Sequence, residues 1–215
     1  NILKKRGLKF YKSFQSLKTK KSPLIDAKIA LSKDYFSINK HSKWITNESS
    51  LKLAHLLRSK YNVIISTSKS INRDNSLLNC RIDGLYNNSP DLIIIDRYLK
   101  IKKNLNIFKK KISRKVFLYT MKKDYNKIKW LRKKKIKVIL VKKMYNKDDY
   151  KNIFKSLILK GYSRIYVESG LTFTNFLIKN RLLNNIYIFK TNFNLGKHGL
   201  NNDSSKIIKK IPLKN

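Results

Sequence analysis

The sequence predicts an α/β domain with a mostly parallel central sheet and helices flanking its faces. Two observations lead to this fold class. Short continuous apolar runs, typical of strands buried on both faces, recur along the chain, and amphipathic stretches separate them. Such alternation of strand and helix favours parallel strands joined by right-handed crossovers. At 215 residues, 41% of them hydrophobic, the chain is long enough for one domain with a sizeable core.

The domain is expected to begin at Pro23, and we assign it residues 23–215. Residues 1–22 are basic with interspersed aromatic residues, and we expect a lead-in helix or linker there. The apolar runs predict strands at residues 24–31, 63–67, 92–95, 116–119, 138–141, 164–167 and 186–189. The intervening stretches predict helices at residues 46–60, 124–135, 148–160 and 172–179. Thr46 is the expected N-cap of the first helix, with Glu48 in its first turn, where a carboxylate interacts favourably with the helix dipole.

Cysteine content and the start of the chain limit the classes of protein. The single Cys80 excludes a disulfide framework and a cysteine-cluster metal site, and it fits a reducing cytoplasm. We expect no metal ion. No apolar run approaches the roughly 20 residues of a membrane helix, and the basic start lacks the apolar region of a signal peptide. The chain begins without Met, and we interpret it as a piece of a longer product.

The formal net charge of +39 allows two interpretations. A basic nucleic-acid-binding protein would gather Lys and Arg on one face to contact phosphates. An AT-rich genome would instead scatter Lys, Asn and Ile along the chain and deplete Ala, Gly and Pro, whose codons are GC-rich. We favour the second interpretation, because lysines occur in nearly every segment and the chain has only six Gly and three Pro. We therefore expect no specific nucleic-acid partner and no membrane partner.

Open α/β sheets bind ligands beyond the carboxyl ends of their strands, and three segments meet that condition. Residues 168–172 follow a predicted strand and start a helix, where Gly170 permits a tight turn and free N–H groups can receive a phosphate. Glu168 would face the crevice there, or alternatively interact with the helix dipole. Residues 70–81 follow another strand and combine hydroxyl, carboxylate and guanidinium groups in what we expect to be a loop. Such a loop suits a phosphosugar site, and a merely solvated loop is the alternative.

The third segment, residues 42–46, leads into the helix that ends at Arg58. On a wheel of about 100° per residue, Arg58 falls inside an apolar arc. The arc is formed by Leu51, Leu53, Ala54 and Leu57. A cation on a buried face needs an anionic partner, which is either a carboxylate in an internal salt bridge or a bound phosphate. The helix pattern does not distinguish between these two partners of Arg58.

Six segments, taken in order, carry a resemblance to a known family. They are K-x-A-x-S-x-D-G at residues 28–35, S-x-W-I-T at 42–46, L-R at 57–58, T-V-x-x-D-x-P-x-L-x-x-R at 70–81, a strand ending in Asp-Arg at 93–97, and V-E-x-G-x-T at 167–172. Over about residues 23–200 the set resembles the reductase domain of the bifunctional riboflavin deaminase/reductase family, whose fold is that of dihydrofolate reductase. Four positions depart from the family pattern: Tyr35 replaces Gly, Ser70 replaces Thr, Ile71 replaces Val and Ser76 replaces Pro.

The resemblance implies a cytoplasmic, NADPH-dependent oxidoreductase of riboflavin biosynthesis. It would reduce the ribosyl chain of 5-amino-6-(5-phosphoribosylamino)uracil to the ribitylamino product. The family implies a homodimer and a zinc-deaminase domain, which would precede this chain or be a separate protein. Relative to the family, the end at Asn215 comes early by about one strand. The alternatives are a basic nucleic-acid-binding protein and an inactive relative of the reductase fold.

The resemblance also implies roles for individual residues. The substrate would contact Ser42, Arg58, Leu78, Arg81 and Glu168, with the arginines at its phosphate, because guanidinium and phosphate pair in a bidentate manner. NADPH would contact Ala30, Trp44, Ser70, Asp74, Arg97, Gly170, Leu171, Thr172, Phe173, Thr174, Asn175 and Phe176. Lys28 and Glu168 would handle protons as hydride reaches C1′ of the opened ribose.

Overall fold

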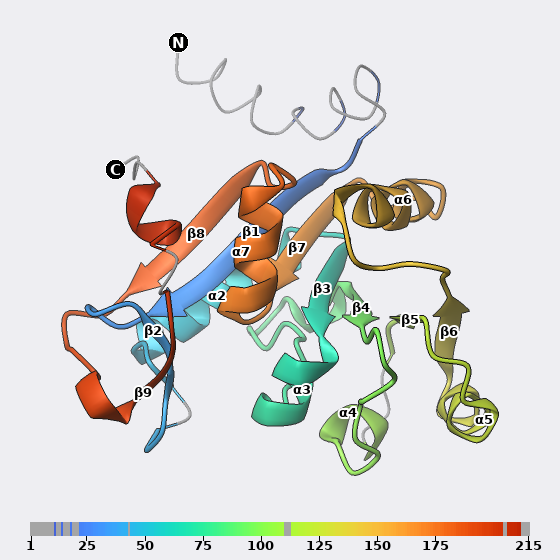
Figure 1. Cartoon of the computed structure of the whole chain (residues 1–215), viewed down its shortest axis with the longest axis horizontal. Coiled ribbons are helices and arrows are strands. Elements are labelled where there is room, and N and C mark those ends of the chain that lie inside the picture. Colours follow the sequence, from blue (N-terminus) through green and yellow to red (C-terminus); the bar gives the residue numbers. More distant parts are fainter. Residues whose placement is uncertain are drawn as a thin grey trace.

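The central sheet of the protein is parallel. A computed structural model of the chain describes residues 22–42, 44–109, 113–203 and 206–211, together with residues 11, 14 and 18. Within these residues the sheet has seven strands in the order β6-β5-β4-β3-β7-β1-β8, and every pairing is parallel (Figure 1). The predicted α/β class is confirmed. The lead-in segment predicted for residues 1–22 lies almost wholly outside the described residues.

All the strands and helices predicted within residues 23–215 form, with ends that match the prediction or differ from it by at most two residues. The sheet strands are β1 (Leu24–Leu31), β3 (Val63–Thr67), β4 (Asp91–Ile95), β5 (Val116–Thr120), β6 (Ile136–Leu140), β7 (Arg164–Glu168) and β8 (Asn185–Lys190). The helices are α2 (Glu48–Ser59), α3 (Ser68–Asp74), α4 (Asn106–Lys109), α5 (Tyr125–Lys133), α6 (Lys147–Ile158) and α7 (Leu171–Lys179). No helix of the described part is long and apolar enough to span a membrane.

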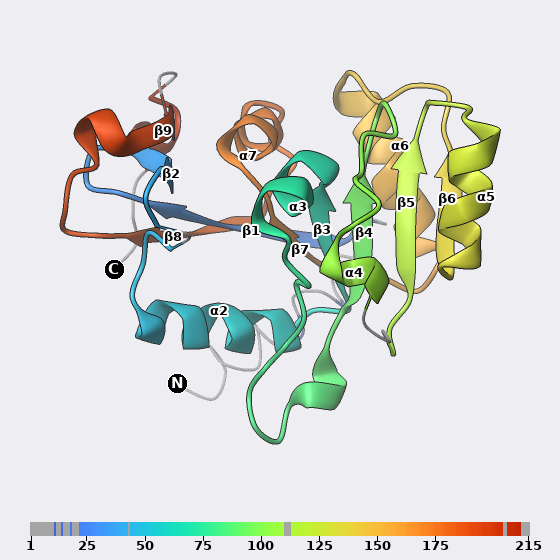
Figure 2. The ribbon, with the colours of Figure 1, turned by 90° about the horizontal axis from the view of Figure 1, so that it is seen from below.

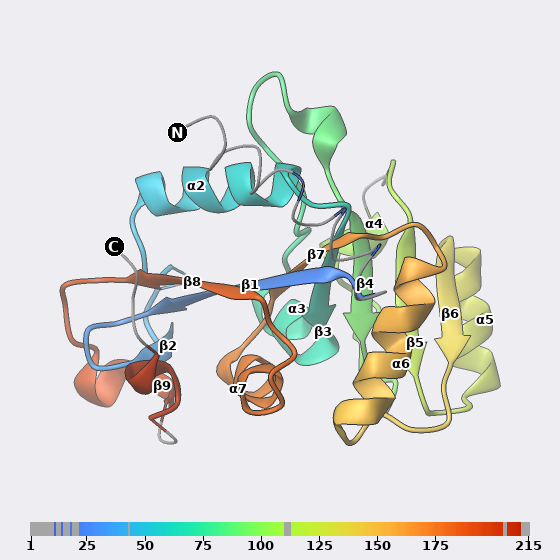
Figure 3. The ribbon, with the colours of Figure 1, turned by 90° about the horizontal axis from the view of Figure 1, so that it is seen from above.

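Successive side chains along each strand point to opposite faces of the sheet, so a hydrophobic core forms on each face. In β3, Val63 and Ile65 face one core, while Ile64 faces the other. Helices α6 and α7 cover the first core, and α2, α4 and α5 cover the second. Figures 2 and 3 show α2 on one side of β1 and β8, with α7 on the other side. Both faces of the sheet are thus buried, as the continuous apolar runs require.

Strand β7 lies between β3 and β1, although it follows β6 in the chain. Helix α3, which follows β3, contributes Ile71 to the second core. Helix α7, which follows β7, contributes Phe173 and Leu177 to the first core. Because the chain leaves these neighbouring strands toward opposite faces, a crevice opens beyond their carboxyl ends. This crevice positions the site.

Two local predictions are wrong. The N-cap of α2 is Asn47 rather than Thr46, because the Asn47 side chain accepts the Ser50 N–H at 3.0 Å. The expected loop over residues 70–81 begins instead inside α3, which the Thr67 side chain caps. At seven residues, α3 is too short to show a clear helical period.

A small antiparallel pair, which the sequence analysis does not predict, joins β2 (Phe36–Asn39) to β9 (Gly199–Asn202). The turn before β2 contains Tyr35, at the position where the family pattern has Gly. Tyr35 adopts the left-handed conformation, with φ of 66°, and Lys190 Nζ lies 4.1 Å from the centre of its ring. The turn therefore forms although Tyr35, unlike Gly, adopts this conformation at a cost of roughly 1–2 kcal/mol.

Gly199 allows a close approach between these two strands. Its backbone is extended, with φ of −82°, so an L side chain would not strain the chain there. A Cβ at this position would nevertheless overlap the ring of Phe36. We expect Gly199→Ala to lower the free energy of unfolding by about 1–3 kcal/mol, because the ring must move. In a Phe36→Ala background the same substitution should cost nothing, and denaturant unfolding of the four proteins tests this. Equal losses in both backgrounds would contradict the contact.

Candidate active site

A cleft of about 680 Å³ opens where β1, β3 and β7 reach their carboxyl ends. Residues of β1, β2, β3, β7, α2 and α3 line it, together with residues 75–78. This is the edge of the sheet at which the sequence analysis places all three candidate segments. The topology therefore gathers segments that are far apart in the chain.

A buried ion pair between Arg58 and Glu168 forms one side of the cleft. Arg58 Nε donates to Oε2 of Glu168 at 2.8 Å, and Nη2 donates to Oε1 at 2.7 Å. Nη1 donates to the carbonyl oxygen of Asn79 at 3.0 Å. Burial would raise the pKa of Glu168, but the charge and hydrogen bonds of Arg58 outweigh it and lower the pKa to about 2. Of the two partners left open for Arg58, the internal carboxylate is present.

Lys28 lies directly beside Glu168. The two are register partners on the adjacent strands β1 and β7, so their side chains project from the same face of the sheet. Lys28 is buried, and its Nζ lies 4.9 Å from the centre of the Phe189 ring. Burial lowers the pKa of Lys28, and the charge of Arg58 adds to this, while Glu168 and Asp74 oppose it. Lys28 therefore releases a proton more readily than an exposed lysine does.

The segment of residues 77–81 lies beside the ion pair, because Asn79 accepts from Arg58, and its backbone is held in a strained conformation at Leu78. Leu78 has a left-handed φ of 53°, which is unfavourable for a residue with a side chain. Arg114 Nη1 donates to the carbonyl oxygens of Leu78 at 2.7 Å and of Pro90 at 2.8 Å, and Nη2 donates to that of Leu77. These bonds fix the strained backbone, as expected where surrounding structure determines an unusual conformation.

Helix α7 begins at the floor of the cleft. Gly170 is its N-cap and supplies no side-chain cap, while the Gly170 N–H donates to Ser70 Oγ at 3.1 Å. The buried Ser169 Oγ has no hydrogen-bond partner among the described residues. The first N–H groups of a helix lack partners within the helix and attract anions. This end of the cleft therefore suits a phosphate group.

Most of the predicted site residues line the cleft. They are Lys28, Ala30, Ser42, Trp44, Arg58, Ser70, Asp74, Leu78, Arg81, Glu168 and Gly170. Arg97 and residues 171–176 do not line it. Arg97 lies in the turn after β4, with its guanidinium 4.7 Å from the centre of the Tyr145 ring. Within α7, Leu171, Phe173 and Thr174 are buried, so the helix presents its main-chain start to the cleft rather than these side chains.

Two residues that the sequence analysis misses also shape the cleft. His55 lies one turn before Arg58 on α2, and its ring nitrogens contact both Arg58 and Arg81. Its signal is the spacing of three residues from Arg58, which places both on one helix face. Arg114 has no local signal, because it acts on main-chain oxygens of distant residues.

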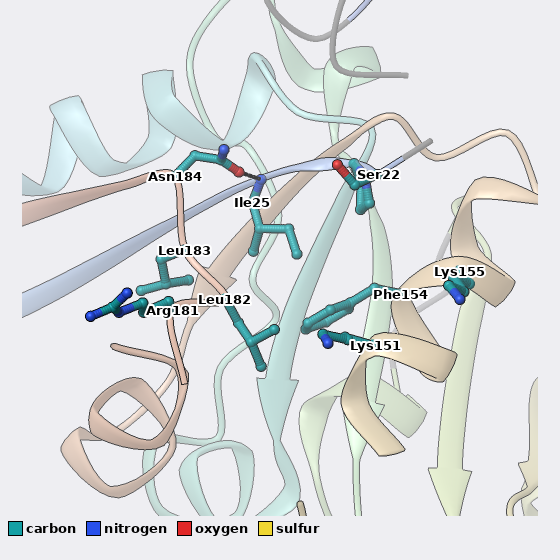
Figure 4. A pocket seen from close by; sticks show the side chains of 10 residues that line it. Ser22, Ile25, Lys151, Phe154, Lys155, Arg181, Leu182, Leu183 and Asn184 are labelled. Atoms are coloured by element: carbon teal, nitrogen blue, oxygen red, sulfur yellow. Dashed lines mark hydrogen bonds between the residues drawn. The ribbon is translucent and has the colours of Figure 1, made fainter. Parts of the chain in front are cut away.

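A second hollow, of about 270 Å³, lies at the start of β1 (Figure 4). Phe154 and Leu182 contribute apolar surface, and Lys151, Lys155 and Arg181 contribute the cations. None of the predicted site residues lines it. The converging carboxylate, cations and helix start lie in the larger cleft.

The parallel sheet, covered by helices on both faces and with a cleft at the carboxyl ends of its strands, defines a fold of the dihydrofolate reductase type. The chain belongs to the RibD C-terminal domain family, which matches residues 25–207. The 5-amino-6-(5-phosphoribosylamino)uracil reductase of Buchnera aphidicola subsp. Acyrthosiphon pisum is 32% identical over 165 residues, which are 70% of this chain and 75% of that protein.

Solved structures share the fold at low identity. A deaminase/reductase of Thermotoga maritima has a TM-score of 0.75 at 20% identity, covering 94% of this chain and 54% of its own. RibD of Acinetobacter baumannii has a TM-score of 0.75 at 15% identity, covering 89% of this chain and 52% of its own. The riboflavin biosynthesis reductase Rib7 of Saccharomyces cerevisiae has a TM-score of 0.65 at 19% identity, covering 85% and 78%. The chain thus spans about half the length of the two bacterial structures.

The ion pair predicts how stability depends on pH. The pKa of Glu168 in the folded chain, about 2, lies below its ordinary value of 4.5. The stabilisation is therefore complete above pH 4.5 and is lost as the pH falls toward 2, by about 3 kcal/mol in all. Denaturant unfolding between pH 7 and pH 2.5 should show this loss, and Glu168→Gln should remove it. Glu48→Gln is the control, because Glu48 forms an exposed pair with Lys52. A parent and a Glu168→Gln variant with the same pH slope would contradict the assignment.

Proposed function

We propose that the chain reduces the ribosyl chain of 5-amino-6-(5-phosphoribosylamino)uracil, with NADPH as the hydride source. The observation that carries the proposal is the convergence of Lys28, Glu168, Arg81 and the start of α7 in one cleft. The name of the Buchnera relative, at 32% identity, supports the same substrate. Neither a nucleic-acid-binding role nor loss of activity is favoured, because the site is assembled.

A nicotinamide cofactor fits the floor of the cleft. The start of α7 has main-chain N–H groups without a side-chain cap, and the Ser169 hydroxyl lacks a partner among the described residues. These groups would hold the diphosphate of the cofactor. Residues Ala30, Trp44, Ser70 and Asp74 line the rest of that space. When bound, the cofactor supplies the hydride, and the protein supplies orientation and electrostatics.

We assign the proton to Lys28. Reduction by hydride also consumes one proton, which a side chain near the reacting carbon must deliver. Burial lowers the pKa of Lys28, whereas the pKa of Glu168 is about 2, so Glu168 stays ionised at neutral pH. Glu168 then stabilises positive charge beside Lys28 and near the substrate, and it takes a smaller part in proton transfer than the sequence analysis implies.

Arg81 is the anchor that we assign to the substrate phosphate, together with Ser42. Both are exposed in the cleft. Arg58, in contrast, donates from Nε and Nη2 to the carboxylate of Glu168 and from Nη1 to the carbonyl oxygen of Asn79. Arg58 therefore supports the site by holding Glu168, in addition to any contact with the substrate.

Assembly and cellular location belong to the same proposal. We propose a cytoplasmic homodimer that receives its substrate from a zinc deaminase, as a preceding domain or a separate protein. The two bacterial structures, of which the chain covers about half, include a protein described as both deaminase and reductase.

Cofactor preference is testable through Arg97, which we propose contacts the 2′-phosphate of NADPH. Its Nε is buried without a hydrogen-bond partner in the described part of the chain. We expect NADPH to bind at least about tenfold more tightly than NADH, the effect of one charge-assisted hydrogen bond, and Arg97→Ala to remove this preference. Fluorescence titration at moderate salt measures it, because salt screens the nonspecific attraction of a chain with charge +39. Arg132→Ala, on α5, controls for net charge. Equal affinity of the parent for both cofactors would contradict the proposal.

The two ends of the substrate should separate in kinetics. Lys28→Met and Glu168→Gln should lower kcat, by about a hundredfold for the proton donor, because the reacting end is affected. Arg81→Ala should mainly raise KM, by roughly tenfold to a hundredfold, because a remote phosphate supplies binding energy. Lys33→Met, which removes an exposed lysine outside the cleft, is the control. Steady-state kinetics with the phosphorylated ribosylaminopyrimidine measures these effects, after thermal unfolding has shown that each variant is folded. Full kcat in Lys28→Met would refute the assignment.

A further inference from the structure

His55 lies at the centre of the cationic side of the cleft. Its Nδ1 is 3.2 Å from Arg58 Nη1, 3.1 Å from the main-chain nitrogen of Arg81 and 3.0 Å from the carbonyl oxygen of Asn79. Its Nε2 is 3.2 Å from Nη2 of Arg81. The imidazole thus bridges α2 to the segment of residues 77–81, which carries Arg81.

Three of these four neighbours are hydrogen-bond donors, because guanidinium and main-chain N–H groups only donate. A neutral imidazole accepts through one ring nitrogen only, and a protonated imidazole accepts through neither. In the tautomer with the proton on Nδ1, that nitrogen donates to the carbonyl oxygen of Asn79, and Nε2 accepts from Nη2 of Arg81. Burial, then the charges of Arg58 and Arg81, lower the pKa of His55 to about 4, although the Asn79 carbonyl and Glu168 oppose this. His55 is therefore uncharged at neutral pH.

Because His55 is uncharged, it affects the charges of Arg58 and Arg81 differently from a carboxylate at the same position. Arg58 has a carboxylate partner in Glu168, so its charge is compensated. The ring of His55 accepts from Arg81 and orients its guanidinium without compensating its charge. An acidic residue at this position would orient Arg81 equally well but would neutralise it. An uncharged acceptor leaves Arg81 with its full charge for an anionic group.

Arg114 supports the same segment at its first two residues. It donates to the carbonyl oxygens of Leu77 and Leu78. Residues 77–81 are therefore fixed at both ends, by Arg114 at the carbonyl oxygens of the first two residues and by His55 at the carbonyl oxygen of Asn79 and the guanidinium of Arg81. The backbone that carries Arg81 is rigidly placed before any substrate arrives, which reduces the entropy cost of binding.

We propose that His55 is a positioning residue, which as a neutral acceptor aims Arg81 into the cleft and thereby selects a phosphorylated sugar over an unphosphorylated one. The proposal rests on the proposed function for the identity of the reaction, but its binding step concerns only the phosphate. It goes beyond the roles that the resemblance implies, in which His55 has no part.

A series of three substitutions separates orientation from charge. His55→Gln keeps a neutral acceptor and should bind ribose 5-phosphate within about twofold of the parent. His55→Ala loses the acceptor and should weaken binding about tenfold, the effect of one hydrogen bond to a charged group. His55→Glu should weaken it further, to about a hundredfold, because a carboxylate pairs with Arg81 and repels the phosphate. Isothermal calorimetry with ribose 5-phosphate, and with ribose for comparison, measures these affinities.

A purely structural role predicts another order. If His55 only anchored the segment, His55→Glu would bind as well as or better than His55→Ala, because the carboxylate still holds Arg81. That result, or parent-like binding by His55→Ala, overturns the proposal. Lys52→Gln is the control, since it lies exposed on the same helix and changes the net charge by the same one unit as His55→Glu. Thermal unfolding checks that each variant is folded.

Turnover distinguishes failure of this proposal from failure of the proposed function. In the active enzyme the three variants should raise KM for the phosphorylated substrate in the same order, with kcat and the KM for NADPH within about twofold of the parent. If the parent reduces no ribosylaminopyrimidine, the proposed function fails, while the order of ribose 5-phosphate affinities still tests His55. If the parent is active and the order is lost, only the role of His55 is overturned.

Discussion

The ion pair between Arg58 and Glu168 is the interaction on which the rest of the cleft depends. It ties the last turn of α2 to the end of β7, and through Asn79 it also reaches the segment of residues 77–81. Its negative partner contributes to the electrostatic environment of both Lys28 and His55. Removal of either partner would leave an uncompensated charge in a buried place, which is strongly unfavourable. The pair therefore fixes geometry and charge together.

The fold is predictable from the sequence wherever the pattern is long and the burial complete. Strands such as β3 and β4 are continuous apolar runs, which a domain of this size can place only inside a sheet covered on both faces. Helix α3 and the pair β2–β9 are not predictable in this way. Helix α3 is only seven residues long, and β2 is half-buried and pairs Phe36 with Asn202, so neither has a clear local period.

At the site, the helix wheel establishes that Arg58 needs an anion but does not identify it. A carboxylate and a bound phosphate meet that need equally, and only the packing of α2 against β7 places Glu168 within reach. The side chains in the motifs converge because they follow neighbouring strands. Arg114 acts on main-chain oxygens, which every residue has, so no pattern of side chains could reveal it. His55 has a signal in its spacing from Arg58, but not one that distinguishes it from a solvated histidine.

The place of β7 between β3 and β1 has a consequence for how the molecule is made. Strand β1 pairs only with β7 and β8 in the described sheet, so the first strand has no neighbour until the chain has been synthesised past residue 168. Pairings of such high sequence separation are slow to form, because the entropy cost of closing a long loop comes before any contact that offsets it. Strands β3 to β6 can assemble earlier, because the connections between them are much shorter than the chain between β1 and β7. The enzyme would then mature late, since the step that inserts β7 also brings Glu168 to Arg58 and Lys28.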